Sequence, residues 1–258
     1  MPRNCGIKLQ IEEYLKRIGY EGTLDQSLET LQKLQRLHLQ HIPFENLDIH
    51  LGREISLELP DVFEKLVRKK RGGYCYEMNG LLAWALDVLG FQVTLHDAKL
   101  YANDGTLLPT SQHLVLLVYL QETWIVDVGW GKGFTEPLLT ETSFQKDQMA
   151  QIYCSSSVST GYQVKKLSKD GKWKPLYELL LASSTLEDFK ERNRYHQTSP
   201  DSLFRKYPIC ILLKPEGYFE LRNKQFTMDV NGEKKLESIN ESQMMNCLSE
   251  KFGICLTN

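Results

Sequence analysis

The stretch RGGYCYEMNGLL, residues 71–82, places a lone cysteine behind a Gly-Gly pair and at the start of an apolar helical pattern. We expect this helix to begin near Cys75 and to end at Gly90. Free backbone N–H groups and the helix dipole favour negative charge at a helix N-terminus. The position therefore favours the thiolate of Cys75, whereas a thiol that only fills a core can sit anywhere on an apolar face.

Composition sets outer limits on the class of protein. The chain has 258 residues, a formal net charge of −2 and 41% hydrophobic residues, enough for a substantial core. No run approaches the about 18 apolar residues of a membrane span, and the first residues lack the apolar core of a signal peptide. The near-neutral charge gives no reason to expect a nucleic-acid partner, and the short basic run 68–71 is interpreted as a solvated helix end.

Cysteine spacing argues against a metal site. None of the six cysteines stands in a CxxC pair and no HExxH occurs, so no zinc site is expected. Without a secretion signal, the cysteines are best interpreted as reduced thiols of a cytoplasmic protein.

The hydrophobic period changes twice along the chain. Residues 1–90 carry helical patterns: one helix stops at Gly19, a capping box at Thr23 and Gln26 opens the next, and Asp61 after Pro60 is expected to cap a third. Residues 91–185 are rich in short apolar or β-branched runs, and residues 186–258 mix helical and strand patterns. We therefore expect an α+β fold with domains at 1–90, 91–185 and 186–258.

Two polar residues interrupt apolar strand patterns downstream of Cys75. His113 opens HLVLLV, and Asp127 is the only acid inside WIVDVGW. A carboxylate in such a run is costly to bury unless it is paired, and a cysteine nucleophile needs a base that a third group orients. Each residue alone fits a structural role better, and the three together fit a cysteine-hydrolase-like triad of Cys75, His113 and Asp127 and separate structural roles about equally well.

The register of the hairpin that carries His113 and Asp127 tests this triad. A two-residue turn would place Asp127 opposite Leu116, on the wrong face of the sheet for His113. A three-residue loop over 120–122 would place it opposite Val115, and one over 121–123 would place it opposite Leu117, both on the same face as His113. We therefore predict an odd-numbered loop or a bulge between the two residues.

The glycine-rich GWGKGF, residues 129–134, follows this hairpin. Pro137 and the absence of a following helical pattern disfavour a nucleotide-binding loop. We expect either a loop in which the backbone approaches a ligand or a plain turn.

Several ordered motifs resemble those of the arylamine N-acetyltransferases over nearly the full chain. PFENLDI at 43–49 resembles the PFENL signature, and RGGYCYEMNGLL resembles the cysteine block. HLVLLV and VDVGWG resemble the histidine and aspartate strands, and QTSPDSLF at 197–204 resembles the T-S-P-x-S-x-F segment. The resemblance implies a helical N-terminal domain, a central antiparallel β-barrel and a C-terminal α/β lid, with a papain- or transglutaminase-like catalytic core.

The resemblance also implies a ping-pong reaction. Cys75 would take the acetyl group from acetyl-CoA, which serves as a co-substrate with no permanently bound cofactor, and an aromatic amine or hydrazine would then attack the thioester. His113 would hold the thiolate and manage protons, Asp127 would orient His113, and the Tyr76 backbone N–H would serve the oxyanion. No nucleic acid or membrane partner is implied.

Further positions correspond to the family's binding sites. Phe44, Trp130 and Phe204 match acceptor-pocket positions; Thr110, Ser111, Tyr195 and Thr198 match stretches near coenzyme A. Trp130 stands where the family commonly has phenylalanine, so the pocket should be narrower. The segment DAKLYAND departs from the family pattern, and the chain is expected to lack the C-terminal tail that reaches coenzyme A in mammalian enzymes.

Two other functions use the same residues. A cysteine hydrolase would pass the acyl group to water, and a non-catalytic protein would merely bind coenzyme A or an aryl group. A burst of acyl-enzyme that persists until an amine is added distinguishes the transferase from the hydrolase, and the complete set of triad residues argues against the binding protein.

Overall fold

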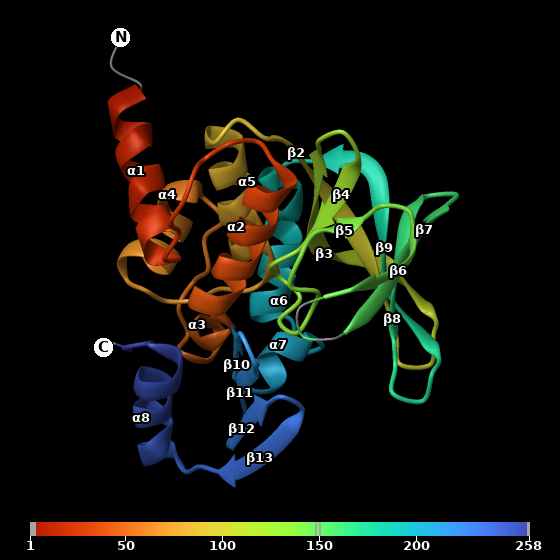
Figure 1. Ribbon diagram of the computed structural model, residues 1–258. Coiled ribbons are helices and arrows are strands. Elements are labelled where there is room, and N and C mark those ends of the chain that lie inside the picture. The colour runs from red at the N-terminus through yellow and green to blue at the C-terminus, as the bar shows by residue number, and fades with distance from the viewer. Residues whose placement is uncertain (1–3, 148, 150, 257–258) are drawn as a thin grey trace.

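Helices dominate the N-terminal part of the computed structural model, which describes residues 4–147, 149 and 151–256. These helices lie together on one side of the molecule (Figure 1). In chain order they are α1 (Asn4–Arg17), α2 (Leu28–His41), α3 (Leu47–His50), α4 (Leu59–Phe63), the π-helical η1 (Glu64–Arg68) and α5 (Cys75–Val88).

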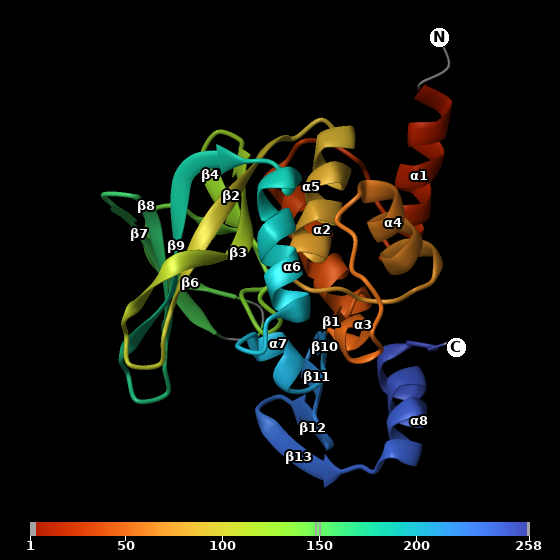
Figure 2. The same ribbon diagram turned by 180° about the vertical axis from the view of Figure 1, so that it is seen from behind.

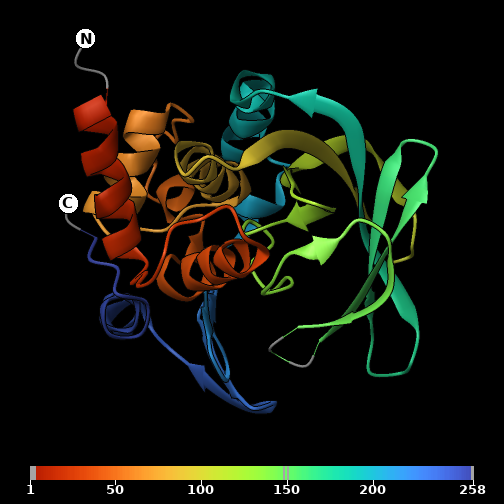
Figure 3. The same cartoon turned by 45° about the horizontal axis from the view of Figure 1, so that its top comes forward.

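An eight-stranded antiparallel sheet makes up the middle of the chain, with the strand order β5-β4-β3-β2-β9-β8-β7-β6. Its end strand β5 contacts β6 and β7, so the sheet curls into a nearly closed barrel, visible from above in Figure 3. The strands are β2 (Gln92–Tyr101), β3 (Leu107–Tyr119), β4 (Thr123–Val126), β5 (Leu138–Leu139), β6 (Thr142–Lys146), β7 (Ile152–Val158), β8 (Gly161–Leu167) and β9 (Trp173–Ser184).

The C-terminal part combines short helices with a second antiparallel sheet. The helix α6 runs between the barrel and the N-terminal helices, as Figure 2 shows from behind. The helices are η2 (Leu186–Phe189), α6 (Lys190–Thr198), α7 (Leu203–Lys206) and α8 (Glu241–Phe252). The strands are β10 (Ile209–Lys214), β11 (Gly217–Arg222), β12 (Gln225–Val230) and β13 (Glu233–Ser238).

The expected three-part division is crossed by one strand. β1 (Phe44–Glu45) lies in the helical part of the sequence but pairs with β10, with Phe44 opposite Ile211, and so forms one edge of the five-stranded sheet β1-β10-β11-β12-β13. Asn46 extends the connection, because its side chain accepts from the Ile209 amide at 2.7 Å and donates to the carbonyls of Phe204 and Tyr207.

The alternation of β3 divides its side chains between two cores. Leu114, Leu116 and Val118 pack with the helices, whereas Val115 and Leu117 pack inside the barrel. This two-residue period is what a strand buried on both faces requires. His113 shares the parity of the barrel-facing residues.

The odd hairpin loop predicted between His113 and Asp127 is confirmed. β3 and β4 pair Leu116 with Val126 and Tyr119 with Thr123, which leaves a three-residue loop closed by a hydrogen bond from the Leu120 amide to the Glu122 carbonyl. Extending this register by one residue puts Asp127 opposite Val115 and on the same face as His113.

Two predicted helix starts were wrong. α2 begins later than the expected capping box, with Ser27 as its N-cap, and Gln26 instead donates to the Leu89 carbonyl at the end of α5. α4 begins before Asp61 because Pro60 fits the first turn of a helix, where its missing N–H is not needed.

The basic run before Cys75 is also only partly as expected. Arg68 is half exposed, consistent with a solvated helix end, but Arg71 is buried, because it pairs with buried carboxylates beneath the cysteine helix.

Candidate active site

Cys75 is the first residue of α5 and is buried. The glycines before it are needed for close approach: a Cβ on Gly72 would lie 1.9 Å from the Pro43 carbonyl oxygen. The N-cap amide of Tyr74 is satisfied by the Glu77 carboxylate, at 3.1 Å, which fixes the first turn. The expected start near Cys75 is thereby confirmed, and the sulfur is held at a rigid helix N-terminus.

His113 and Asp127 form a buried pair on the neighbouring hairpin. The His113 Nε2 lies 2.7 Å from the Asp127 Oδ2, and both side chains are almost fully buried. Because a carboxylate only accepts, Nε2 carries the ring hydrogen in the neutral tautomer, and Nδ1 is the basic atom. The structure therefore joins two of the three predicted triad members by direct contact, and Cys75 lines the same cavity as His113.

Asn79 locks Asp127 in place and was missed by the sequence reasoning. Its side-chain amide donates to the Asp127 Oδ1 at 3.0 Å, and its carbonyl oxygen accepts from the Val128 amide at 2.9 Å. It lies one turn after Cys75 on α5. A polar residue at i+4 from the cysteine, inside an apolar helix, was the available signal.

The glycine-rich loop after Asp127 packs against the cysteine. A Cβ on Gly129 would lie 2.6 Å from the Cys75 Cα and 2.7 Å from the Asn79 amide nitrogen, so only glycine fits. The Gly129 amide also donates to the Asp127 Oδ1 at 2.8 Å. The backbone of this loop therefore approaches the cysteine helix, and its approach to a ligand stays a prediction.

Burial opposes the thiolate expected from the helix N-terminus. Removal from water raises the pKa of the Cys75 thiol far above its ordinary value, and the negative charge of Asp127 adds to the rise. Hydrogen bonds from the backbone amides of Leu114 and Tyr76 lower the pKa but do not offset burial. An isolated Cys75 is thus a neutral thiol, and a thiolate there requires a positive partner.

A second buried charged cluster, the ion network, underlies the start of α5. Arg71 binds Glu45 at 2.7 Å and Asp48 at 3.0 Å, and Lys65 binds Asp48 at 2.7 Å and Glu77 at 2.8 Å. Burial raises the pKa of Glu77 to about 7, although Lys65 opposes the rise. The network ties η1, the segment after Pro43 and the cysteine helix together.

One cavity of about 440 Å³ contains the cysteine, the histidine and all three predicted acceptor residues. Phe44 and Phe204 lie with ring centroids 6.2 Å apart, and the Trp130 ring meets His113 edge-on at 5.2 Å. Trp130 therefore supports the histidine as well as lining the cavity. The remaining lining is Leu100, Leu108, Gln112, Gly129, Tyr195, His196, Asp201, Ser202, Leu203, Tyr207, Ile209, Ile211 and Arg222.

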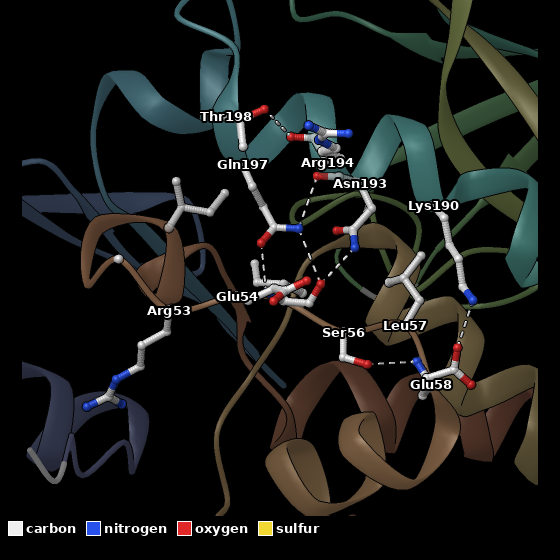
Figure 4. Close-up of a pocket in the computed structure, with 13 residues that line it drawn as sticks. Arg53, Glu54, Ser56, Leu57, Glu58, Lys190, Asn193, Arg194, Gln197 and Thr198 are labelled. Carbon is white, nitrogen blue, oxygen red and sulfur yellow. Dashed lines mark hydrogen bonds and ion pairs between the residues drawn. The ribbon is translucent and has the colours of Figure 1, made fainter.

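The four predicted coenzyme A residues are spread over different surfaces. Tyr195 lines the cysteine cavity, and Thr110 is an exposed residue of β3. The backbone of Ser111 belongs to the same strand, but its side chain lies outside what the structure describes. Thr198 lines a separate cavity of about 680 Å³ between residues 52–58 and α6, drawn in Figure 4. The structure therefore does not bring the described side chains of Thr110, Tyr195 and Thr198 together in one cavity.

The described residues lack the features of a membrane-spanning helix and of a metal-binding cluster. Among residues 4–147, 149 and 151–256, no helix is long and apolar enough to cross a membrane. Within the same residues, no group of three or more histidine, cysteine, aspartate and glutamate side chains is arranged to hold a metal ion.

A buried cysteine at a helix start, beside a histidine–aspartate pair on a barrel, is an arrangement suited to thiol-based acyl chemistry. Residues 27–258 match the sequence profile of the N-acetyltransferase family. The chain is 33% identical to the arylamine N-acetyltransferase pineal gland isozyme NAT-3 of Gallus gallus, over 96% of this chain and 95% of that protein. It is 32% identical to arylamine N-acetyltransferase 1 of Homo sapiens, with the same coverage.

Solved structures agree with the sequence relatives. The arylamine N-acetyltransferase from Salmonella typhimurium superposes with a TM-score of 0.91 at 28% identity, over 96% of this chain and 92% of that one. The Mycobacterium marinum enzyme in complex with CoA superposes with a TM-score of 0.87 at 27% identity, over 95% and 92%. The chain belongs to the arylamine N-acetyltransferase family and its enzyme class, and the expected α+β fold with an antiparallel barrel is confirmed.

Proposed function

We propose that this protein transfers an acetyl group from acetyl-CoA to the nitrogen of an arylamine or arylhydrazine by a ping-pong reaction through a Cys75 thioester. One observation carries the proposal: a buried cysteine shares a cavity with a histidine that is itself bound to a buried aspartate at 2.7 Å. The family and the CoA complex of a relative support the two substrates.

The first half-reaction begins with a proton transfer. His113 takes the Cys75 proton on Nδ1, and Asp127 at Nε2 stabilises the imidazolium. The resulting ion pair supplies the positive partner that a buried thiolate needs. The sulfur then attacks the acetyl carbonyl carbon, the carbonyl oxygen becomes negative beside the Tyr76 amide, and the carbon–sulfur bond to coenzyme A breaks. The imidazolium gives its proton to the departing thiolate.

The second half-reaction uses the same groups in reverse. The amine nitrogen attacks the thioester carbonyl, His113 accepts a proton from that nitrogen, and the bond to Cys75 breaks. The imidazolium then returns its proton to the Cys75 sulfur, which regenerates the starting state. The carbon–sulfur bond to Cys75 thus replaces the carbon–sulfur bond to coenzyme A in the first half-reaction, and a carbon–nitrogen bond replaces the bond to Cys75 in the second.

Phe44, Trp130 and Phe204 are proposed to receive the aromatic ring of the acceptor. All three line the cysteine cavity, and aromatic side chains favour stacked or edge-on contact with a planar ligand. Trp130 also touches His113, so its replacement is expected to affect catalysis as well as acceptor choice.

Donor binding is proposed to involve Tyr195 at the cavity and Thr110 and Ser111 on β3. Thr198 would take part only if coenzyme A passed around the end of α6 to the separate cavity. A further cavity of about 510 Å³ is lined by Lys132, Lys166, Lys169 and Lys234. Glu216 and Asp229 share this lining and Lys132 is paired with Glu220 at 2.6 Å, so the remaining lysines are the candidate contacts for the phosphates of the donor.

The test is direct detection of the acyl-enzyme. The wild-type protein mixed with acetyl-CoA is expected to release one equivalent of CoA in a burst and to gain one acetyl group on the peptide that contains Cys75, by mass spectrometry. The Cys75→Ala variant should give neither, and Cys210→Ala serves as the control for removal of a buried thiol.

The fate of the acyl-enzyme separates transferase from hydrolase. An acetyl-enzyme that persists until aniline or a hydrazide is added supports the transferase. One that decays at the same rate with and without amine identifies a hydrolase, and a wild-type protein that forms no acetyl-Cys75 contradicts the whole proposal. A cytoplasmic location stays a prediction from the sequence.

A further inference from the structure

His196 is a buried histidine in the wall of the cysteine cavity. It lies on α6 and is only 5% exposed. Within the described part of the chain, neither ring nitrogen meets a hydrogen-bond partner in bonding geometry. An unpaired buried polar atom costs about 1–3 kcal/mol, so a folded protein rarely keeps two on one ring without a use for them.

The surroundings of His196 are aromatic. Its ring lies near those of Tyr76, Tyr195 and Phe204, with centroid distances of 5.8, 5.6 and 5.1 Å, and edge-on to Tyr74 at 6.1 Å. Removal from water, with a smaller effect from His113, lowers the pKa of His196 to about 4. The ring is therefore uncharged near neutral pH and offers one N–H donor and one nitrogen acceptor.

The nearest polar backbone group does not satisfy this ring. β3 carries an irregularity that skips Gln112, because Ala98 pairs with His113 and Lys99 with Ser111. The freed Gln112 carbonyl accepts from the Tyr76 hydroxyl at 3.1 Å. It approaches His196 closely enough to favour the protonated ring, but it does not form a regular hydrogen bond with it.

We propose that His196 is a substrate-positioning residue, which hydrogen-bonds an uncharged amide-type group of the molecule bound beside Cys75. The inference rests on the proposed function. An amide-type group offers both an N–H and a C=O, so it can pair with whichever His196 nitrogen faces it, as acceptor or as donor, whereas a charged group gains no opposite charge from this ring. Two substrates carry such a group: the amide-containing arm of coenzyme A, and the –CO–NH– unit of an acylhydrazide acceptor.

The experiment compares His196→Phe with wild type in matched pairs of half-reactions. Phenylalanine keeps the ring and removes both nitrogens. Acetylation of Cys75 is measured with acetyl-CoA and with p-nitrophenyl acetate, which lacks the amide arm. Deacetylation of the preloaded enzyme is measured with benzohydrazide and with aniline, which lacks the amide unit.

The expected result is a loss of about tenfold in one amide-bearing reaction, with its amide-free partner within about twofold, as a single hydrogen bond predicts. A loss with acetyl-CoA alone identifies the donor arm, and a loss with benzohydrazide alone identifies the acceptor. The variant should also be at least as thermally stable as wild type, because two unpaired buried nitrogens are removed. His196→Asn, which retains a donor and an acceptor, should recover part of the lost rate.

The control is His38→Leu. His38 is fully buried in the helical core, bonds Tyr14 through Nδ1 and leaves Nε2 without a partner among the described residues, but it does not line the cavity. Its replacement should leave all four rates within about twofold. Equal losses in all four reactions of His196→Phe, or no loss in any, would overturn the proposal. A wild-type enzyme that never forms acetyl-Cys75 would instead refute the proposed function.

Discussion

The two buried charged clusters beside Cys75 differ in how their charges are paired. In the ion network, Arg71 and Lys65 each bind two carboxylates, so the charged groups mainly satisfy one another. In the other cluster, the Asp127 carboxylate binds Nε2 of His113, and Asn79 donates to that carboxylate and holds it in place. The His113 ring borders the cavity. The first cluster is suited to hold a helix in place, and the second to exchange a proton with a ligand.

Replacing Asp127 should have the largest effect, and on rate rather than on folding. In Asp127→Asn the amide can present a donor to His113, which favours the wrong tautomer of the ring. We expect a loss of at least about 10³-fold in the acetylation rate of Cys75, measured by the CoA burst.

Asp147→Asn is the matched control for Asp127→Asn. Asp147 is also buried, but it accepts the Gln151 amide away from the cavity. The acetylation rate of Cys75 in the Asp147→Asn variant should stay within a few-fold of wild type. An Asp127→Asn enzyme with near wild-type burst kinetics would contradict the role given to this pair.

Replacing Arg71 should have the opposite effect: a loss of stability with little loss of rate. Arg71→Met leaves Glu45 without its ion-pair partner, whereas Asp48 keeps Lys65. Breaking a buried ion pair typically costs about 3–5 kcal/mol. We expect the free energy of unfolding in urea to fall by about that amount, while the folded fraction keeps a kcat within a few-fold of wild type.

Arg68→Met provides the comparison for Arg71→Met. Arg68 belongs to the same basic run but is half exposed and bonds Glu13 at the surface. Its loss should cost less than about 1 kcal/mol. Equal destabilisation by the two variants would mean that burial of the network does not matter.

The smallest expected effect is the pH dependence that Glu77 gives to stability. Burial raises the pKa of Glu77 to about 7, above an unfolded value near ~4.3. The folded state therefore binds the proton more tightly, and this contribution to stability is present below the unfolded pKa and lost as pH rises through about 7. In Glu77→Gln, the decline in unfolding free energy between pH 5 and pH 8 should shrink by up to about 3 kcal/mol.

Urea titrations at several pH values, with the exposed Glu64→Gln as control, measure this slope. A decline that is the same in Glu77→Gln and in wild type would show that the carboxyl stays ionised throughout. Glu77 would then belong to the network only as a fixed charge.

Local patterns were enough to predict the odd-numbered hairpin loop once a triad was assumed, whereas the triad itself was predicted with the help of the family resemblance. Parity and loop length place His113 and Asp127 on one face because side chains in a strand alternate, and the observed register follows from that rule. The cysteine helix was predictable because glycine, an apolar period and a terminal glycine mark its ends.

Long-range partners were not predictable in the same way. Nothing near Arg71 in sequence shows that its charge meets Glu45 and Asp48 after folding, so it was interpreted as a surface residue. His196 stands in a polar helical stretch, and only the packing of four aromatic rings around it shows that it is buried. A low pKa was expected for Cys75 because of the helix dipole. The desolvation that the fold imposes, which raises this pKa, could not be seen from the sequence.

The pairing of β1 with β10 also has a consequence for synthesis on the ribosome. Phe44 and Glu45 leave the ribosome long before their strand partners Ile211 and Cys210, so this strand stays unpaired while most of the remaining chain is made. A nascent chain that ends before β10 would keep this edge open, although the cysteine and its helix are already complete. Stalled or truncated products should therefore be substrates for chaperones and proteases, and only chains that include the last fifth of the sequence, from β10 onward, would complete this sheet.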